Sequence, residues 1–288
     1  MKDPAALSEP GNIWRCGRHF YDLASRPLLM GILNVTPDSF SDGNSYETVA
    51  AAVAAAERMV EAGADIIDVG GESTRPGAEP VSVEEELARV IPVITGLSKR
   101  ISVPVSIDTW KAKVASAALQ AGAEIVNDIS AMTFDPLMAE TVARTDAGVV
   151  LMHTRGRPQA MQIDTVYDDI VAEVAGFLKT AMKSAEKNGI SAQRILVDPG
   201  IGFGKSVSGN LELIRRLDEF SCLGRPLLIG PSRKSFIGRI LGRETGERIF
   251  GTAAVVSMAM QKGARIFRVH DVNAMRDVVD MTAAIMQL

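Results

Sequence analysis

The sequence has few of the residues that build disulfide or zinc frameworks. Its 288 residues include two cysteines, Cys16 and Cys222, and three histidines, His19, His153 and His270. These numbers exclude a disulfide-rich fold and a cysteine-rich zinc site, and low cysteine content is typical of a reducing cytoplasm. We therefore expect a cytoplasmic protein that folds around a hydrophobic core, since a chain of this length needs no disulfide or structural metal.

Excess positive charge and long apolar segments are also missing. Lys and Arg number 31 and Asp and Glu number 35, so the formal net charge is −4. This balance disfavours a broad nucleic-acid-binding surface. The most apolar long run, residues 49–56, is mostly alanine and is far shorter than the ~20 residues of a membrane span. The first ten residues contain no signal-peptide core. We expect neither a nucleic-acid partner nor a membrane association.

What is present is a globular composition, with 47% hydrophobic and 23% charged residues. Short apolar runs alternate with longer helical patterns along the chain. The runs lie at 28–33, 66–69, 103–107, 124–126, 148–152, 194–197, 226–229 and 265–269, and the helical patterns at 46–61, 83–97, 111–120, 136–144, 167–187, 210–218, 248–262 and 272–286. Continuous apolar strands are buried on both faces, which indicates a parallel α/β sheet.

The length of each unit favours a closed barrel. Without its first 27 residues the chain has 288 − 27 = 261 residues, or about 33 for each of eight units, which suits a (β/α)₈ TIM barrel. An open, doubly wound sheet is the alternative. Gly63, Gly122 and Gly263 each precede a strand in a similar helix exit, so a left-handed helix cap is repeated along the chain.

Residues 1–27 stand outside this pattern. Segments 13–16 and 18–23 flank Gly17 and predict a short N-terminal β-hairpin. We expect this extension to close the bottom of the barrel. No linker interrupts the rest, so residues 28–288 are expected to form the barrel, in a single domain overall.

Polar side chains follow nearly every expected strand. In a barrel of this kind, catalytic groups come from the carboxyl ends of the strands and the loops after them. Arg268 and His270 lie two residues apart and so share one face of the last strand. Four further side chains end a strand and would converge on the same pocket: Asn34, Asp108, Asn127 and Asp198.

Some polar residues near these ends also have a structural interpretation. An aspartate before a helix is commonly its N-cap, and this is the better interpretation for Asp128 and Asp271. For His153 a structural hydrogen bond and a ligand contact are equally good interpretations. Residues 199–206 resemble a P-loop, but Pro199 stands where its first glycine should be.

The strand-end groups suit a flat nitrogen heterocycle and an anion. A carboxylate accepts two N–H groups from a 2-amino-4-oxo pyrimidine edge, and an amide both donates and accepts beside it. Glycines at 200, 202 and 204 would let the backbone approach a flat ligand, with Phe203 as a face. Arg268 and His270 suit a pyrophosphate, and Asn34 offers an oxygen to Mg²⁺.

The same residues carry a resemblance to a known family. Six blocks occur in the family's order: residues 34–43 (NVTPDSFSDG), 71–77 (GESTRPG), 106–109 (SIDT), 198–205 (DPGIGFGK), 232–234 (SRK) and 268–270 (RVH). On these blocks the chain resembles the dihydropteroate synthases, and the match extends from about Trp14 to the C-terminus. Asn44 departs from the pattern, because the family usually has a second glycine there.

The resemblance implies a Mg²⁺-dependent transferase of folate biosynthesis. It would join 6-hydroxymethyl-7,8-dihydropterin pyrophosphate to p-aminobenzoate by a dissociative path, giving 7,8-dihydropteroate and pyrophosphate. Sulfonamides would inhibit it, and the family is usually homodimeric through barrel helices. Asp42 and Asp108 would stabilise positive charge on the pterin C9.

The resemblance also implies roles for individual residues. Pterin would be bound by Asp108, Asn127, Ile129, Met152, Asp198, Gly202, Phe203 and Lys234. Pyrophosphate would be bound by Asn34, Arg268 and His270, with Asn34 also at the metal. p-Aminobenzoate would be bound by Phe40, Thr74, Arg75, Pro76, Ser232 and Lys234. The expected catalytic residues are Asp42, Asp108, Lys234, Arg268 and His270.

Three alternatives stay open at this point. A corrinoid-linked methyltetrahydrofolate methyltransferase would use a similar barrel, but should lack the signatures at 40–42 and 73–75. A Schiff-base aldolase would use Lys234 as its nucleophile. A non-catalytic pterin-binding protein would need no pyrophosphate clamp of Asn34, Arg268 and His270.

Overall fold

The computed structural model describes residues 12–35, 45–74 and 77–288, and in it eight parallel strands close into a barrel. The strands follow one another around the barrel in chain order, and the last pairs with the first. They are β3 (Leu28–Asn34), β4 (Ile66–Gly70), β5 (Val105–Asp108), β6 (Ile125–Asp128), β7 (Gly148–Met152), β8 (Ile195–Asp198), β9 (Leu227–Ile229) and β10 (Ala264–Val269). The predicted TIM barrel is confirmed, and the open-sheet alternative is wrong.

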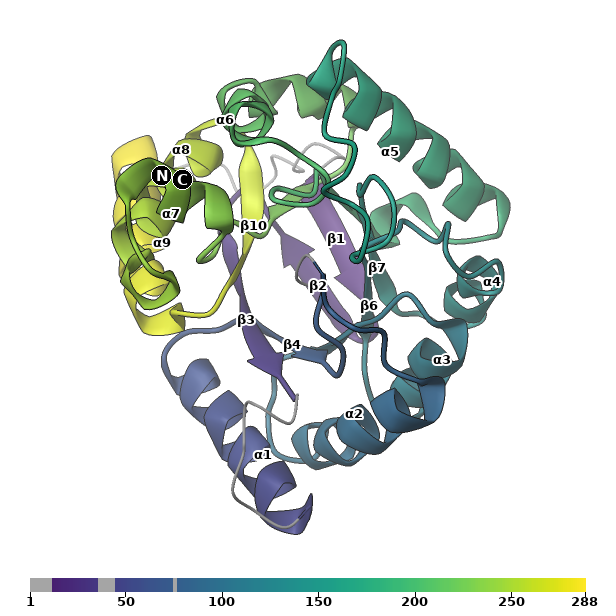
Figure 1. The fold of residues 1–288 in the computed structure, drawn as a ribbon. Coiled ribbons are helices and arrows are strands. Elements are labelled where there is room, and N and C mark those ends of the chain that lie inside the picture. Colours follow the sequence, from purple (N-terminus) through teal and green to yellow (C-terminus); the bar gives the residue numbers. More distant parts are fainter. Residues whose placement is uncertain (1–11, 36–44, 75–76) are drawn as a thin grey trace, which may run out of the picture.

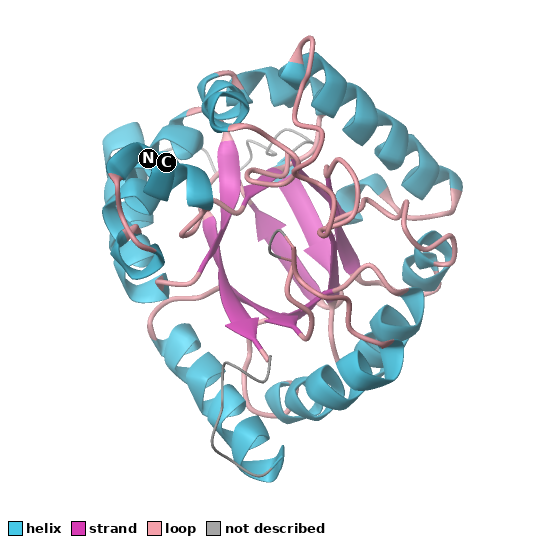
Figure 2. Ribbon diagram, viewed as in Figure 1, coloured by secondary structure: helices cyan, strands magenta, loops and turns pink. Residues whose placement is uncertain are grey.

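Helices surround the barrel as an outer ring (Figures 1 and 2). They are α1 (Ser45–Glu61), α2 (Val83–Leu97), α3 (Ala112–Gln120), α4 (Met138–Ala143), α5 (Ile170–Lys187), α6 (Val207–Arg215), α7 (Ser235–Leu241), α8 (Ile249–Gln261) and α9 (Val272–Met286), with short 3₁₀ turns at Ala192–Arg194, Leu217–Leu223 and Thr245–Glu247. In the described part of the chain, none of these helices is both long and apolar enough to cross a membrane.

Local signals explain most helix ends. The Ser82 and Asp169 side chains accept backbone N–H groups at the starts of α2 and α5. The repeated exit glycines Gly63, Gly122 and Gly263 all have positive φ, between 97° and 110°, as the left-handed caps require. The sequence did not predict α7, because its seven residues are too few to display a helical period.

A hairpin covers the amino ends of the strands. β1 (Ile13–Cys16) and β2 (His19–Asp22) pair antiparallel, and the turn residue Gly17 has a φ of +53°. Trp14 and Cys16 are fully buried among inward-facing barrel side chains, including Leu196 and Ile266. The Trp14 Nε1 donates a hydrogen bond to the Arg194 carbonyl oxygen at 3.2 Å. Apolar packing therefore fills this end of the barrel, and the opposite end carries the polar side chains.

Candidate active site

The inward face of each strand becomes polar toward its carboxyl end. Along β4, Ile66 packs inside the barrel, so the alternation of a strand also turns Asp68 inward. The same parity applies to the predicted residues, each from a different strand: Asn34, Asp108, Asn127, Asp198 and Arg268. The structure therefore brings them together at the mouth of the barrel.

Arg268 links two carboxylates across this mouth. Its Nε lies 2.6 Å from Asp68 Oδ2, and its Nη2 lies 2.7 Å from Asp108 Oδ2. The Asn127 Nδ2 also donates to Asp68 Oδ2, at 3.1 Å. Asp68 is fully buried and was not among the residues predicted from the sequence. The available signal was a carboxylate inside the apolar run 66–69, two residues before the strand end.

Several buried acceptors at the mouth have no hydrogen-bond partner within the described residues. These atoms are Asp68 Oδ1, Ser106 Oγ and Asp108 Oδ1. Burial raises the pKa of Asp108, and the Arg268 guanidinium opposes this rise. Burial also raises the pKa of Asp198 to about 6, although the Gly200 N–H hydrogen bond and the Lys234 charge both act to lower it. Unpaired buried acceptors indicate a ligand that donates hydrogen bonds.

A glycine-rich turn follows β8 and supports the mouth. Gly200, Gly202 and Gly204 have φ values of +71°, +86° and +62°, which side chains other than glycine rarely adopt. The Gly200 N–H donates to Asp198 Oδ1 at 2.7 Å. A Cβ at Gly202 would lie 2.8 Å from Lys234 Cδ. The turn thus allows the Lys234 chain to pass close by.

An apolar surface lies beside the polar groups. The Lys234 Nζ is 3.9 Å from the centre of the Phe203 ring. Phe203 belongs to a buried cluster with Trp110, Ile129, Met152 and Met161. The predicted apolar residues Ile129, Met152 and Phe203 are therefore brought together, within reach of Lys234.

Lys205 and His153 support the turn from behind. The Lys205 Nζ donates to the Phe203 carbonyl oxygen at 2.8 Å and lies 3.0 Å from His153 Nδ1. The His153 ring packs edge-on against Phe177 of α5, at 4.9 Å between centroids. Burial lowers the pKa of His153 to about 2 and that of Lys205 to about 7. His153 thus makes the hydrogen bond expected by its structural interpretation, and Lys205, which was not among the predicted residues, supports the turn.

A second polar pair lies between β9 and β10. His270 Nδ1 is 3.0 Å from Ser232 Oγ, and the His270 backbone N–H donates to the same oxygen at 3.1 Å. Asp271 pairs with the Arg233 guanidinium, with 3.0 Å between Oδ2 and Nε.

The two aspartates with an expected capping role behave differently. Asp271 occupies the N-cap position of α9 but its side chain makes no capping hydrogen bond, so that prediction is wrong: the carboxylate is drawn to the nearby guanidinium of Arg233. Asp128 accepts the backbone N–H groups of Ser130 and Met132, at 2.7 and 2.9 Å. It therefore caps a turn rather than a helix.

Some predicted site residues lie outside the described residues. These are Phe40, Asp42, Arg75 and Pro76, together with Asn44. Thr74 is described and is half-buried in the loop after β4.

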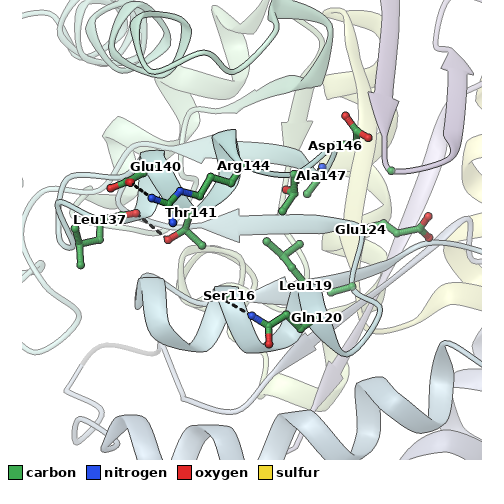
Figure 3. Close-up of a pocket in the computed structure, with 13 residues that line it drawn as sticks. Ser116, Leu119, Gln120, Glu124, Leu137, Glu140, Thr141, Arg144, Asp146 and Ala147 are labelled. Carbon is green, nitrogen blue, oxygen red and sulfur yellow. Dashed lines mark hydrogen bonds and ion pairs between the residues drawn. The ribbon is translucent and has the colours of Figure 1, made fainter.

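A groove elsewhere on the molecule is separate from the mouth. It measures about 550 Å³ and is lined by α3, α4 and the starts of β6 and β7, with Gln120, Arg144 and Asp146 among its residues (Figure 3). None of the predicted site residues lines it. The groove therefore contributes nothing to the site at the mouth.

Comparisons with known proteins agree with this chemistry. Residues 30–270 match the family model described as pterin binding enzyme. A dihydropteroate synthase from Synechocystis is 48% identical over 270 residues, which is 93% of this chain and 93% of that protein.

Two solved structures have the same fold. Dihydropteroate synthase from Xanthomonas albilineans, with 4-aminobenzoic acid, has a TM-score of 0.90 and 46% identity, covering 96% of this chain and 99% of that one. Dihydropteroate synthase from Yersinia pestis, with a sulfonamide drug complex, has a TM-score of 0.90 and 41% identity, covering 96% and 100%. The chain therefore belongs to the pterin-binding enzyme family and, within it, to the dihydropteroate synthases.

Proposed function

We propose that this protein joins 6-hydroxymethyl-7,8-dihydropterin pyrophosphate to p-aminobenzoate, giving 7,8-dihydropteroate and pyrophosphate. The observation that carries this proposal is the set of buried acceptors at the mouth, Asp68, Asp108 and Asp198, beside the apolar face of Phe203. The Xanthomonas relative holds 4-aminobenzoic acid and the Yersinia relative a sulfonamide, which supports an arylamine substrate and inhibition by sulfonamides.

The pterin ring would bind at the strand ends. Asp198 would accept two N–H groups from the pyrimidine edge. Because the Asn127 Nδ2 is held by Asp68, its amide oxygen is the group turned toward a donor. Phe203, Ile129 and Met152 would contact the flat faces, with Gly202 and Lys234 beside them, and Asp108 would lie near C9.

The pyrophosphate would bind between β10 and β3, at Asn34, Arg268 and His270. A Cβ at Gly70 would lie 3.7 Å from both Asn34 Oδ1 and Asp108 Oδ2, so these two side chains flank Gly70. Within the described residues, no group of three or more His, Cys, Asp or Glu side chains is arranged to hold a metal ion. Asn34 alone fits a Mg²⁺ that arrives on pyrophosphate, because Mg²⁺ keeps several waters and binds through substrate phosphates.

The reaction would proceed by breaking the C9–O bond first. The electron pair leaves with pyrophosphate, whose charge Arg268 and His270 would stabilise, and one well-aimed donor contributes roughly 3 kcal/mol. Mg²⁺ would add charge neutralisation at the same oxygens. The Asp108 and Asp42 carboxylates would stabilise the cation at C9. The arylamine nitrogen then forms the new bond and loses a proton, without a strong base.

The p-aminobenzoate would bind nearer the solvent. Thr74 and Ser232 would contact it together with Lys234, and Phe40, Arg75 and Pro76 are the other residues proposed for this subsite. Ser232 already bonds His270, so the proposed arylamine and pyrophosphate subsites share an edge.

We further propose a cytoplasmic homodimer that needs neither nucleic acid nor a membrane. An exposed apolar surface supports the dimer: Phe250 of α8 is 84% exposed, and Met281 and Ile285 of α9 are 64% and 70% exposed. These two helices lie side by side in Figure 1. Large apolar side chains exposed on neighbouring helices are typical of a protein interface.

The experiment that tests the function is release of pyrophosphate that depends on p-aminobenzoate. We expect release from the dihydropterin pyrophosphate only when the arylamine and Mg²⁺ are both present. Borohydride added with substrate should leave the enzyme active and its mass unchanged. A mass increase at Lys234 would instead support the aldolase, and p-aminobenzoate-independent chemistry would overturn the proposal.

A further inference from the structure

An ion cluster outside the mouth joins three segments of the chain. We call it the Lys111 cluster, and it consists of Lys111, Glu72 and Glu86. The Lys111 Nζ lies 2.7 Å from Glu72 Oε2 and 2.6 Å from Glu86 Oε2. The Glu72 and Glu86 side chains are 3% and 0% exposed, and that of Lys111 is 16% exposed. The cluster is therefore largely shielded from water and counterions.

The cluster ties together both ends of the loop between β4 and α2. Glu72 begins this loop, and its Oε1 accepts the Val81 backbone N–H at 2.9 Å. The Lys111 Nζ donates to the Val81 carbonyl oxygen at 2.6 Å. Arg89 adds a hydrogen bond from Nη1 to the Gly71 carbonyl oxygen at 2.7 Å. Each end of the loop is thus held by charged side chains.

From this base the loop reaches over the barrel mouth. The Gly77 N–H donates to the Pro158 carbonyl oxygen at 3.3 Å, and Pro158 follows β7, which is three strands away from β4 around the barrel. In Figure 1 the described parts of the segment between β4 and α2, residues 71–74 and 77–82, lie in front of the barrel interior. Thr74, proposed to contact p-aminobenzoate, is part of this loop.

Lys111 also continues directly from the proposed pterin subsite. It lies three residues after Asp108, and its backbone N–H donates to Thr109 Oγ1 at 3.2 Å. The Lys111 Nζ lies 5.4 Å from the centre of the Trp110 ring, and Trp110 packs with Phe203. One side chain therefore connects the loop base to the strand end that carries Asp108.

We propose that Lys111 is a positioning residue for the second substrate. By pairing with both Glu72 and Glu86 it fixes the loop base, so that Thr74 is held where the arylamine binds. This inference rests on the proposed p-aminobenzoate subsite. Without the ammonium, two buried carboxylates would repel each other and release Val81.

The chain provides a matched control at Lys113. This lysine pairs with Glu84 at 3.2 Å and so also bridges α2 and α3, but the two side chains are 68% and 75% exposed. We expect Lys111→Met to raise the KM for p-aminobenzoate at least fivefold more than the KM for the pterin pyrophosphate. Lys113→Met should change neither KM by more than about twofold, because exposed pairs contribute little.

A structural readout accompanies the kinetics. Hydrogen–deuterium exchange of the peptide containing the Val81 amide should be faster in Lys111→Met than in Lys113→Met. Equal rises in both KM values, or unchanged Val81 exchange, would overturn the positioning role. If Lys111→Met does not fold, the isosteric Glu72→Gln variant is expected to give the same KM split, because a glutamine has one acceptor oxygen and must give up either the Val81 N–H or the Lys111 ammonium.

A third variant separates this inference from the function on which it rests. Thr74→Ala should raise the KM for p-aminobenzoate. If it does not, the assignment of the arylamine to this loop is wrong. If it does while Lys111→Met leaves that KM unchanged, the subsite stands and the role of Lys111 is wrong.

Discussion

Burial governs the acid–base behaviour of single side chains at the mouth. Asp198 is 4% exposed, and burial raises its pKa to about 6. Above that pH it is a carboxylate that accepts two hydrogen bonds, and below it the neutral acid has lost one acceptor and gained a donor. Binding of a pterin edge that donates to Asp198 must therefore weaken as the pH falls through about 6.

This sets a pH dependence for pterin binding. We expect the affinity for a pterin analogue to be constant above pH about 6.5 and to fall roughly tenfold per unit below the pKa. Calorimetric titration between pH 5 and 7.5 measures it. Asp198→Asn should bind weakly with no such dependence, and a wild-type affinity that is flat down to pH 5 would contradict the role of Asp198.

Asp68 provides a second test at the residue scale. Asp68→Asn removes the charge that orients Arg268 and Asn127, so we expect the Kd of a pterin analogue to rise at least about tenfold, or ~1.4 kcal/mol. Asp65→Asn is the control, because Asp65 is another buried, arginine-paired carboxylate next to the same strand, at its opposite end. It should lower the melting temperature without changing the Kd, and equal Kd values for the two variants would refute the prediction.

The side chains that the sequence predicted share one property. Asn34, Asp108 and Asp198 end an apolar run, and a change from apolar to polar is visible locally. Asp68 lies inside its run, and only pairing with β5 and the approach of Arg268 from β10 reveal its role. The side-chain partner of Lys205 is His153, which directly follows β7, and no local sequence pattern indicates this contact.

At the scale of elements, the turns place the strictest requirements on residue type, because they combine positive φ angles with close backbone contacts. The sequence predicted the strands from continuous apolar runs and several helix ends from glycines, because both signals are local. It assigned the glycines at 200–204 to close backbone approach. Their contact with the backbone of the β7 loop could not be predicted, since it depends on how neighbouring units pack.

The glycine-rich turn yields a prediction with a matched control. A Cβ at Gly200 would lie 1.9 Å from the His153 carbonyl oxygen, whereas one at Gly224 would meet no atom within 4 Å, and both residues have positive φ. We expect Gly224→Ala to lower the free energy of unfolding by ~1 kcal/mol and Gly200→Ala by at least ~3 kcal/mol. Urea denaturation measures both changes. Similar midpoints would contradict the prediction, because they would show that the turn adjusts to the added methyl group at little cost in stability.

At the scale of the whole molecule, closure of the barrel could be predicted from regularity. Eight similar units with apolar strands leave few alternatives, and a barrel removes the sheet edges that an open sheet would keep. The proposed dimer depends on which apolar residues are exposed. The sequence of α8 does not show this, because the helix is apolar on most sides. Exposure in the folded chain was needed to identify Phe250 and Met281 as surface residues.

The exposed face of α8 and α9 makes dimerisation testable. We expect the purified protein to have twice the mass of one chain by light scattering, and Phe250→Asp to shift it toward the monomer, because a buried charge opposes association. Leu137→Asp is the control, since Leu137 is 60% exposed beside α4, across the barrel from α8 and α9 (Figure 1). A monomeric wild type, or loss of the dimer in the control, would contradict this interface.

The hairpin at the amino end closes one end of the barrel, so that two ligands bound inside must enter and leave in a fixed order. Trp14 and its neighbours fill the floor, so ligands enter and leave on the side of Asp198. A pterin bound against the strand ends would lie beneath an arylamine bound at the loops. An arylamine that does not react would therefore block dissociation of the pterin. Pterin should then dissociate more slowly when a sulfonamide is bound, and a stopped-flow dissociation rate that is the same with and without the drug would argue for a second exit.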